Sequence, residues 1–374
     1  MAVSIKDLAE LAGVSVSTVT RALADKPDVG KQTRKRILEL AEKHNYQPNI
    51  LARGLVTSRS FTVGVIVPDL TNPFFPELIK GVESTLWNAG YSVILADTDW
   101  RPEKERQIVA QFIARMVDGL IIAPIETKRY HTWIDQIRAA GVPVVSLTRL
   151  EHHDADTVIA SDRFGARTAV EHLIRAGRTR VLYVGNDAAG WANGEREAGL
   201  REAFAEAGLS LSAACIERAP EGSIEAARKC VLQASQRGCD FNAVVAFDDL
   251  MALGVRAGLA ELRKRIPDDV ALIGFDNIEL SALPDIDLTT VDIPKAELGR
   301  VSAQLVLERI TERVEQDNET TFQGPYKEIV LNTRLVVRGS TSEVGAGADS
   351  DRIWSSERTP AHRAPEEIGT KSTD

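Results

Sequence analysis

The chain has 374 residues, with 45 Lys+Arg against 54 Asp+Glu and a formal net charge of -9. This length predicts two or three domains, and the 44% hydrophobic and 26% charged fractions are typical of globular proteins with sizeable cores. The acidic balance excludes a uniformly basic nucleic-acid coat. Because the chain has neither a long apolar run nor an apolar leader, we expect no membrane span or secretory signal and a cytoplasmic protein.

Residues 1–47 show three stretches with helical periodicity. Ser4 precedes an apolar set with Asp7 three residues later, a pattern that caps a helix, and Gly13 ends that helix in a tight turn. Ser15 can cap a second helix, and a third is expected over about 31–44. Two short helices joined by a glycine turn predict a helix-turn-helix, whose second helix fits the major groove of DNA.

The side chains on the second helix suit that placement. Hydroxyls and a guanidinium can reach base edges, and arginine pairs best with guanine. The candidate base contacts are Val16, Ser17, Thr20 and Arg21. The candidate phosphate contacts are Lys6, Lys31 and Arg34, with Lys26 and Lys35 also available. The alternative is a small three-helix bundle whose charges are only solvated.

Residues 61–338 alternate short apolar runs with amphipathic helical stretches, which predicts parallel sheets with helices on both faces. Such a run exceeds one doubly wound sheet, so we expect two α/β lobes enclosing a cleft. At least ten strands are expected, and the seven clearest apolar runs are at 63–67, 93–95, 120–122, 144–145, 181–184, 244–245 and 272–273. Residues 339–374 are rich in small and polar residues, and we expect a disordered tail there.

Other chemistry is weakly indicated. Cys215, Cys230 and Cys239 are odd in number and lack a C-x-x-C spacing, so we expect reduced thiols packed in cores. His152 and His153 have no further spaced ligands, so we expect no metal site. Phosphate-loop, zinc-protease and nucleophile-elbow motifs are missing, so we expect no cofactor and no enzyme.

Several segments in order resemble the LacI/GalR family of bacterial transcription regulators, over about residues 1–338. In the first part of the chain they are SIKDLA at 4–9, GVSVSTVTR at 13–21, NYQPN at 45–49, LARGL at 51–55 and VPDLTNPFF at 67–75. Later they are DDLMALG at 248–254, IGFDN at 273–277 and LTTV at 288–291.

The resemblance implies a homodimer, or a tetramer, that binds a pseudo-palindromic operator through paired helix-turn-helix domains. Residues 48–60 would form a hinge helix on operator DNA, with Leu55 wedged into the minor groove beside Ala52 and Arg53. The alternative for this leucine is packing within the linker. Gly54 replaces a frequent serine and Val56 a basic residue, so we expect a hinge helix that is less stable without DNA.

The resemblance also implies a body like the sugar-binding proteins of the periplasm, used for effector binding and dimerisation. Its N-lobe would span about 61–160 and 292–322, and its C-lobe about 161–291 and 323–338. The implied effector-binding residues are Phe74, Phe75, Thr148, Trp191, Arg196, Asp248 and Asp276. The alternatives are that either phenylalanine closes a core, that Trp191, expected on a loop, only packs, and that Asp276 caps a helix.

Two substitutions bear on the ligand. Thr148 stands where the family often has an acid, and Ile293 where many members carry glutamine. We therefore expect a ligand less hydroxylated than a hexose, or one with an anionic end near Arg196.

Three functional classes remain open at this point: a DNA-binding repressor gated by a small carbohydrate-like effector, a sugar-binding transporter component without DNA regulation, and a sugar-modifying enzyme. Charge favours the first class. Residues 1–60 hold ten Lys+Arg and six Asp+Glu, a net +4, which leaves -13 on the rest of the chain. A basic DNA-reading head on an acidic sensing body is therefore the preferred hypothesis.

Overall fold

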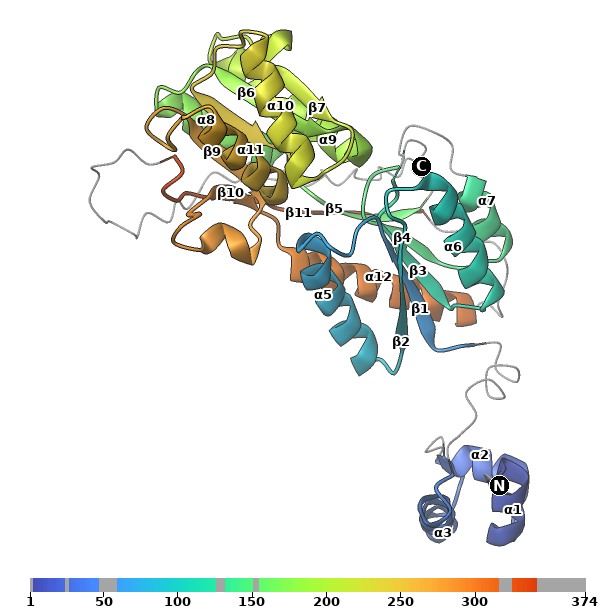
Figure 1. Ribbon diagram of the computed structural model, residues 1–374. Coiled ribbons are helices and arrows are strands. Elements are labelled where there is room, and N and C mark those ends of the chain that lie inside the picture. The colour runs from blue at the N-terminus through green and yellow to red at the C-terminus, as the bar shows by residue number, and fades with distance from the viewer. Residues whose placement is uncertain are drawn as a thin grey trace, which may run out of the picture.

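The computed structural model contains a three-helix head and a body of two α/β lobes (Figure 1). It describes residues 3–23, 27–46, 59–125, 132–150, 155–315 and 325–341. Within these ranges, no helix is both long and apolar enough to cross a membrane.

The head follows from its local sequence. The Ser4 side chain accepts from the backbone N–H of Asp7, and the Asp7 carboxylate accepts from the backbone N–H of Ser4, so the predicted capping pattern is confirmed. Gly13 ends the first helix with a φ of 63°, a left-handed conformation that suits glycine. Leu8, Val19 and Ile37 form the centre of the head's own apolar core. The helices are α1 (Ile5–Ala12), α2 (Val16–Leu23) and α3 (Lys31–Lys43).

The N-lobe is built on a fully parallel sheet with the strand order β11-β5-β4-β3-β1-β2. Its strands are β1 (Thr62–Val67), β2 (Ser92–Asp97), β3 (Gly119–Ile122), β4 (Val144–Ser146), β5 (Asp156–Ala160) and β11 (Glu328–Leu331). One face is covered by α5 (Phe74–Asn88) and α12 (Lys295–Glu315), and the other by α6 (Pro102–Ala114) and α7 (Thr132–Ala139). Because both faces are covered, the central strands are apolar throughout, which made them recognisable.

The C-lobe repeats this plan in the order β12-β10-β9-β8-β6-β7, with only the edge strand β12 antiparallel. Its strands are β6 (Val181–Asn186), β7 (Ile216–Ala219), β8 (Ala243–Ala246), β9 (Ala271–Asp276), β10 (Thr289–Asp292) and β12 (Arg334–Val336). One face carries α8 (Asp162–Arg175) and α9 (Gly190–Glu206), and the other α10 (Ile224–Gln236) and α11 (Asp249–Glu261). Short 3-10 turns are η1 (Asp187–Ala189), η2 (Ala213–Cys215) and η3 (Glu279–Ala282).

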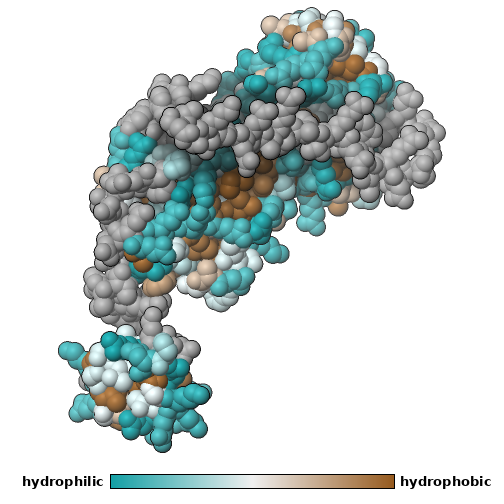
Figure 2. Space-filling view, turned by 180° about the vertical axis from the view of Figure 1, so that it is seen from behind, coloured by the Kyte–Doolittle hydropathy of each residue, from teal (hydrophilic) through white to brown (hydrophobic). Residues whose placement is uncertain are grey.

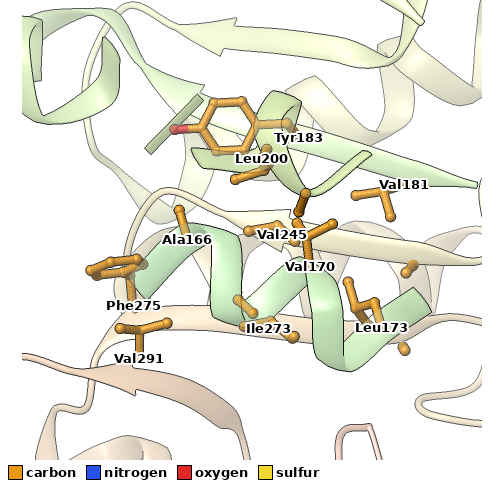
Figure 3. Packing of buried hydrophobic residues seen from close by; sticks show 14 of the residues in the cluster. Ala166, Val170, Leu173, Val181, Tyr183, Leu200, Val245, Ile273, Phe275 and Val291 are labelled. Carbon is orange, nitrogen blue, oxygen red and sulfur yellow. The ribbon is translucent and has the colours of Figure 1, made fainter. Parts of the chain in front are cut away.

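Figure 3 shows the core beneath α8, where Val170 and Leu173 face the strand residues Val245 and Ile273. Apolar side chains are gathered inside both lobes. The face seen in Figure 2 is accordingly mainly hydrophilic, with apolar residues grouped near the middle of the body. The predicted fold class, a helix-turn-helix head with two doubly wound α/β lobes, is confirmed.

The chain passes between the lobes three times: from β5 to α8, from β10 to α12, and from β11 to β12. The last passage differs from the sequence-based boundary, which gave 323–338 to the C-lobe. Residues 328–331 pair with β5 in the N-lobe sheet, so the return to the C-lobe occurs at 332–333. The edge position of β11 explains the difference, because its alternate residues are exposed and no buried apolar run marks it.

The helices α5 and α12 lie side by side with their backbones in close contact (Figure 1). A Cβ atom added at Gly81 would meet the carbonyl oxygen of Ala296, and one at Gly299 would meet the carbonyl oxygen of Leu78. Such contact leaves no side-chain layer in which the helices can slide.

Two expectations were wrong. Cys215 and Cys239 form a disulfide with their Cα atoms 5.8 Å apart, and only Cys230 is free and buried. The C-x-x-C rule could not detect this pair, because the fold brings η2 next to the turn after α10. Two residues assigned to the predicted tail instead belong to the C-lobe: Ser340 and Thr341 are buried, and the Ser340 hydroxyl donates to the Leu272 carbonyl at 2.6 Å.

Candidate functional site

The candidate base-reading residues share one surface of α2. Val16, Ser17, Thr20 and Arg21 are all exposed. The Thr20 hydroxyl donates to the Val16 carbonyl at 2.9 Å, and the Arg21 guanidinium forms an ion pair with Asp28 at 3.1 Å. These groups are free of the head's core and can turn toward a base edge, so the placement agrees with the predicted role.

The candidate phosphate contacts flank that surface. Lys6 on α1 and Lys31 at the start of α3 are exposed, and Arg34 is half-buried. The predicted hinge residues Ala52, Arg53 and Leu55 lie outside the described residues, as does His152 with its neighbour. Base, phosphate and hinge contacts therefore stay predictions.

In the body, Arg196 is the centre of a buried polar cluster between the lobes' facing ends. Its Nε donates to the Asp162 carboxylate at 2.8 Å, and its Nη1 donates to the Phe247 carbonyl. Its Nη2 lies 3.7 Å from the Asp276 carboxylate, and only 7% of the side chain is exposed. Asp162 follows β5, Phe247 follows β8 and Asp276 ends β9, so the carboxyl ends of three strands supply these partners.

Two aromatic rings fix the plane of this guanidinium. The centre of the Arg196 group lies 3.7 Å from the centroid of the Phe275 ring and 4.3 Å from that of Phe247. Contacts of this kind attract a cation to the ring face. Because carboxylates and rings together occupy its surroundings, Arg196 cannot change rotamer without breaking several contacts.

Carboxylates outnumber cations around Arg196. Burial raises the pKa of Asp276 well above its ordinary value, although Arg196 draws it back, and burial also raises the pKa of Asp162. Burial raises the pKa of the nearby Asp248 to about 6, against a backbone N–H from Met251 that lowers it. Arg196 nevertheless already has an ion-pair partner in Asp162 at 2.8 Å, which argues against the expected anionic ligand end beside it.

Asp248 connects the lobes. Its Oδ1 accepts from the Met251 N–H at 2.7 Å and so caps α11, and its Oδ2 accepts from Asn72 of the N-lobe at 3.4 Å. The capping alternative raised for Asp276 therefore applies to Asp248 instead. A hydrogen bond across the cleft makes Asp248 sensitive to the separation of the lobes.

The two phenylalanines at the start of α5 differ. Phe75 is 8% exposed and belongs to the N-lobe core, which is the packing alternative considered for it. Phe74 is half-buried and packs against the cores of both lobes, with its ring edge-to-face on Phe75 at 5.0 Å. Phe74 is therefore the better candidate for an effector contact.

Trp191 lies elsewhere than expected. It is the second residue of α9 rather than part of a loop, and the Arg149 guanidinium lies 5.4 Å from its ring centroid. Both residues line a cavity of about 300 Å³ beside the lobe passages, with Asp162 and Glu195. Trp191 thus lines a cavity that adjoins the Arg196 cluster through Asp162, and the Trp191 ring lies against Arg149.

The two substituted positions lie in different surroundings. Thr148 follows β4, and its half-buried backbone exchanges hydrogen bonds with the Ser146 side chain. Ile293 is 2% exposed in the C-lobe core, so its side chain offers no contact to a ligand. Of the two substitutions, only the one at position 148 therefore falls on a residue that is not buried in a core.

Sequence reasoning missed Asp162, Asn72 and Lys295 as parts of the site. Asp162 obeys the rule that found Asp276, a polar residue just beyond a strand, but β5 was not recognised as a strand. Asn72 lies in the segment VPDLTNPFF, but nothing in that segment was a reason to assign it a role. No sequence pattern around Lys295 marked it as part of a site.

Comparison with known proteins agrees with both parts of the chain. Residues 4–49 match the model of the bacterial regulatory proteins of the lacI family, and residues 60–328 match that of the periplasmic binding proteins and sugar binding domain of the LacI family. The chain belongs to the LacI family of bacterial regulatory proteins. It is a LacI-family transcription regulator with a DNA-binding head and a periplasmic-binding-protein-like body.

Its similarity to other LacI-family members extends over nearly the whole length. The ribose operon repressor of Halalkalibacterium halodurans is 32% identical over 90% of this chain and 97% of that protein. The transcriptional repressor PurR of Vibrio campbellii is 31% identical over 88% of this chain and 98% of that protein. A solved complex of the regulator CelR with cellobiose aligns with a TM-score of 0.68 and 25% identity over 90% of this chain and 99% of that one.

Proposed function

We propose that this LacI-family member is a repressor that binds a pseudo-palindromic operator as a homodimer and responds to a neutral, polyhydroxylated carbohydrate. The observation that carries the DNA part is the exposed face of α2, where two hydroxyls and a guanidinium stand clear of the core. Because its target is DNA, we place its action in the cytoplasm, and we propose no catalytic step for it.

The ligand class follows from the cleft. Asp248 and Asp276 offer carboxylate oxygens that accept from sugar hydroxyls, and the half-buried ring of Phe74 suits the C–H face of a sugar. Arg196 can direct the carboxylates, but its own charge is balanced by Asp162 and Asp276. An anionic ligand would add to an excess of negative charge, so a neutral ligand is favoured.

The proposed mechanism is a shift between two lobe arrangements. Asn72 and Asp248 already join the lobes, and a ligand between them would favour one separation of the lobes over another. That separation sets the spacing of the two N-lobes in a dimer, and hence of the paired heads. Coupling is reciprocal, so operator must change effector affinity by the same factor as effector changes operator affinity.

The test is a DNA selection with the full chain, followed by binding measurements at several salt concentrations. We expect a two-fold symmetric consensus and an affinity that falls steeply with salt. An unselective pool after repeated rounds would reject the repressor proposal. It would favour the alternative of a sugar-binding transporter component.

A thermal-shift panel tests the ligand class independently of DNA. The panel contains D-ribose, cellobiose, a polyol, a sugar acid and a nucleobase. We expect stabilisation by a neutral sugar or polyol that is abolished by Phe74→Ala and retained in Trp87→Ala, a change at an exposed ring on the same helix. Stabilisation by the sugar acid or the nucleobase alone would reject a neutral carbohydrate effector.

A further inference from the structure

Lys295 is a buried cation at the passage from the C-lobe to the N-lobe. It is the first residue of α12, and only 2% of its surface is exposed. Its ammonium donates to the carbonyls of Asp276 at 2.6 Å, Asn277 at 3.1 Å and Ile293 at 3.4 Å, and lies 3.3 Å from the Glu77 carboxylate. An ammonium has three protons, so these acceptors use all of its donors.

The C-lobe end of this contact is a strained turn. Asp276 has a φ of 101° and Asn277 a φ of 53°, both in a region that residues other than glycine rarely adopt. Such conformations persist only where surrounding contacts hold them. Here the Asn277 N–H also donates to the Thr290 hydroxyl at 3.2 Å, and its side chain donates to Asp292 at 3.1 Å. The direction of this turn decides where the Asp276 carboxylate points.

The N-lobe end of the contact is α5. Glu77 lies in the first turn of that helix, one turn from Phe74, which touches the cores of both lobes. The backbone contacts at Gly81 and Gly299 fix α5 against α12. A displacement of Lys295 must therefore move α12 and α5 together.

We propose that Lys295 is a positioning residue that holds the Asp276–Asn277 turn toward the cleft and transmits the position of that turn to α5. The carbonyls of the turn bind the ammonium directly, so a movement of the turn either displaces α12 or leaves a buried cation without acceptors. The second outcome is the more costly, because a buried charge must be compensated. The role in effector response rests on the proposed function, whereas the mechanical link does not.

The first test uses hydrogen exchange on the full chain without ligand or DNA. In Lys295→Met we expect the amides of Asn277 and Ile278 to exchange about tenfold faster or more, since a hydrogen bond to a charged group is lost at each carbonyl of the turn. The central strand β8 should keep its protection. The control is Lys80→Met, which removes an exposed lysine from α5. Equal exchange at the turn in both variants would overturn the positioning role.

Glu77→Gln provides a second variant, because Glu77 is half exposed and its loss leaves the three carbonyl contacts of Lys295 in place. It should leave the turn protected, and it keeps the test available if Lys295→Met does not fold. Faster exchange at the turn in Glu77→Gln than in the wild type would show that Glu77, and not the carbonyl contacts of Lys295, holds the turn, and would overturn the proposal.

The second test measures transmission. Asp276→Asn removes one carboxylate beside Arg196 and so disturbs the turn from the cleft side. We expect this change to alter exchange in the first turns of α5 in the wild-type background, and to have at most a small effect there in the Lys295→Met background. A purely structural role would give additive effects, which would overturn the proposal. Because no ligand or operator is used, failure of the repressor proposal leaves this test intact.

Discussion

Arg21 and Arg196 are the two arginines on which the functional hypothesis depends, and their surroundings are opposite. Arg21 has 61% of its side chain exposed and one ion pair, with the equally accessible Asp28. Arg196 has 7% of its side chain exposed and lies close to two carboxylates and two aromatic rings. Arg21 can exchange its carboxylate partner for a base at little cost, whereas Arg196 cannot leave its carboxylate partners without exposing buried charges.

The difference matches the two roles proposed for these residues, reading a base and shaping the effector cleft. An exposed ion pair contributes little to stability, so the Arg21 guanidinium stays available for another partner. A buried pair contributes through the penalty of breaking it, so the cleft keeps its geometry rigid.

Removing the buried guanidinium should have the largest effect. Arg196→Met leaves Asp162 and Asp276 buried without their partner, and we expect the free energy of unfolding to fall by about 3–5 kcal/mol. Urea titration measures this change. The control Arg163→Met removes a side chain that is 49% exposed and should cost no more than about 1 kcal/mol. Equal losses in the two variants would remove the contrast between exposed and buried pairs.

The pH dependence of stability should reveal Asp248. Its folded pKa of about 6 lies above the ordinary 3.8, so the folded state binds more protons between these values. Its contribution is then greatest below about pH 4 and is lost as the pH rises through 6, by up to about 3 kcal/mol. Asp248→Asn should flatten the melting temperature between about pH 4 and 6, whereas Asp240→Asn, at an exposed carboxylate, should not. An unchanged profile in Asp248→Asn would contradict this assignment.

The exposed arginine should show the reverse behaviour. Arg21→Met should change the free energy of unfolding by less than about 1 kcal/mol. The same change should weaken binding to the selected DNA by about 1–3 kcal/mol, with loss of preference at one base pair. Asp28→Asn, which frees the guanidinium, should leave that preference in place. Uniform weakening on all sequences would instead assign Arg21 to the phosphates.

The smallest effect is expected for a phosphate contact. Lys31→Gln should make the dependence of log affinity on log salt shallower by about 0.9 per subunit, without changing the consensus sequence. Lys229→Gln, an exposed lysine on α10, is the control and should leave the slope unchanged. A changed base preference in Lys31→Gln would mean that the residue reads sequence.

The sequence predicted the elements that have a strong local signal. All seven strands located from the sequence are present, because each contains an apolar run. The central strands are buried on both faces, whereas β2, at a sheet edge, is partly exposed. The strands β5, β7, β10, β11 and β12 were not located; in β5, β7 and β11 the acidic residues Asp156, Glu217 and Glu328 interrupt the apolar pattern. Partners of Arg196 depend on which strand ends meet in space, and the Cys215–Cys239 pair depends on the same long-range order. Neither can be obtained from spacing along the chain.

The three passages between the lobes have a consequence for synthesis on the ribosome. The head is complete once residue 46 has emerged, but the N-lobe needs α12 and β11, which end at residue 331, and the C-lobe needs β12 up to residue 336. At translation rates of about 5–20 residues per second, roughly 15–60 seconds separate completion of the head from completion of the two lobes. For that interval each nascent chain carries a finished DNA-reading head with no finished body to control it.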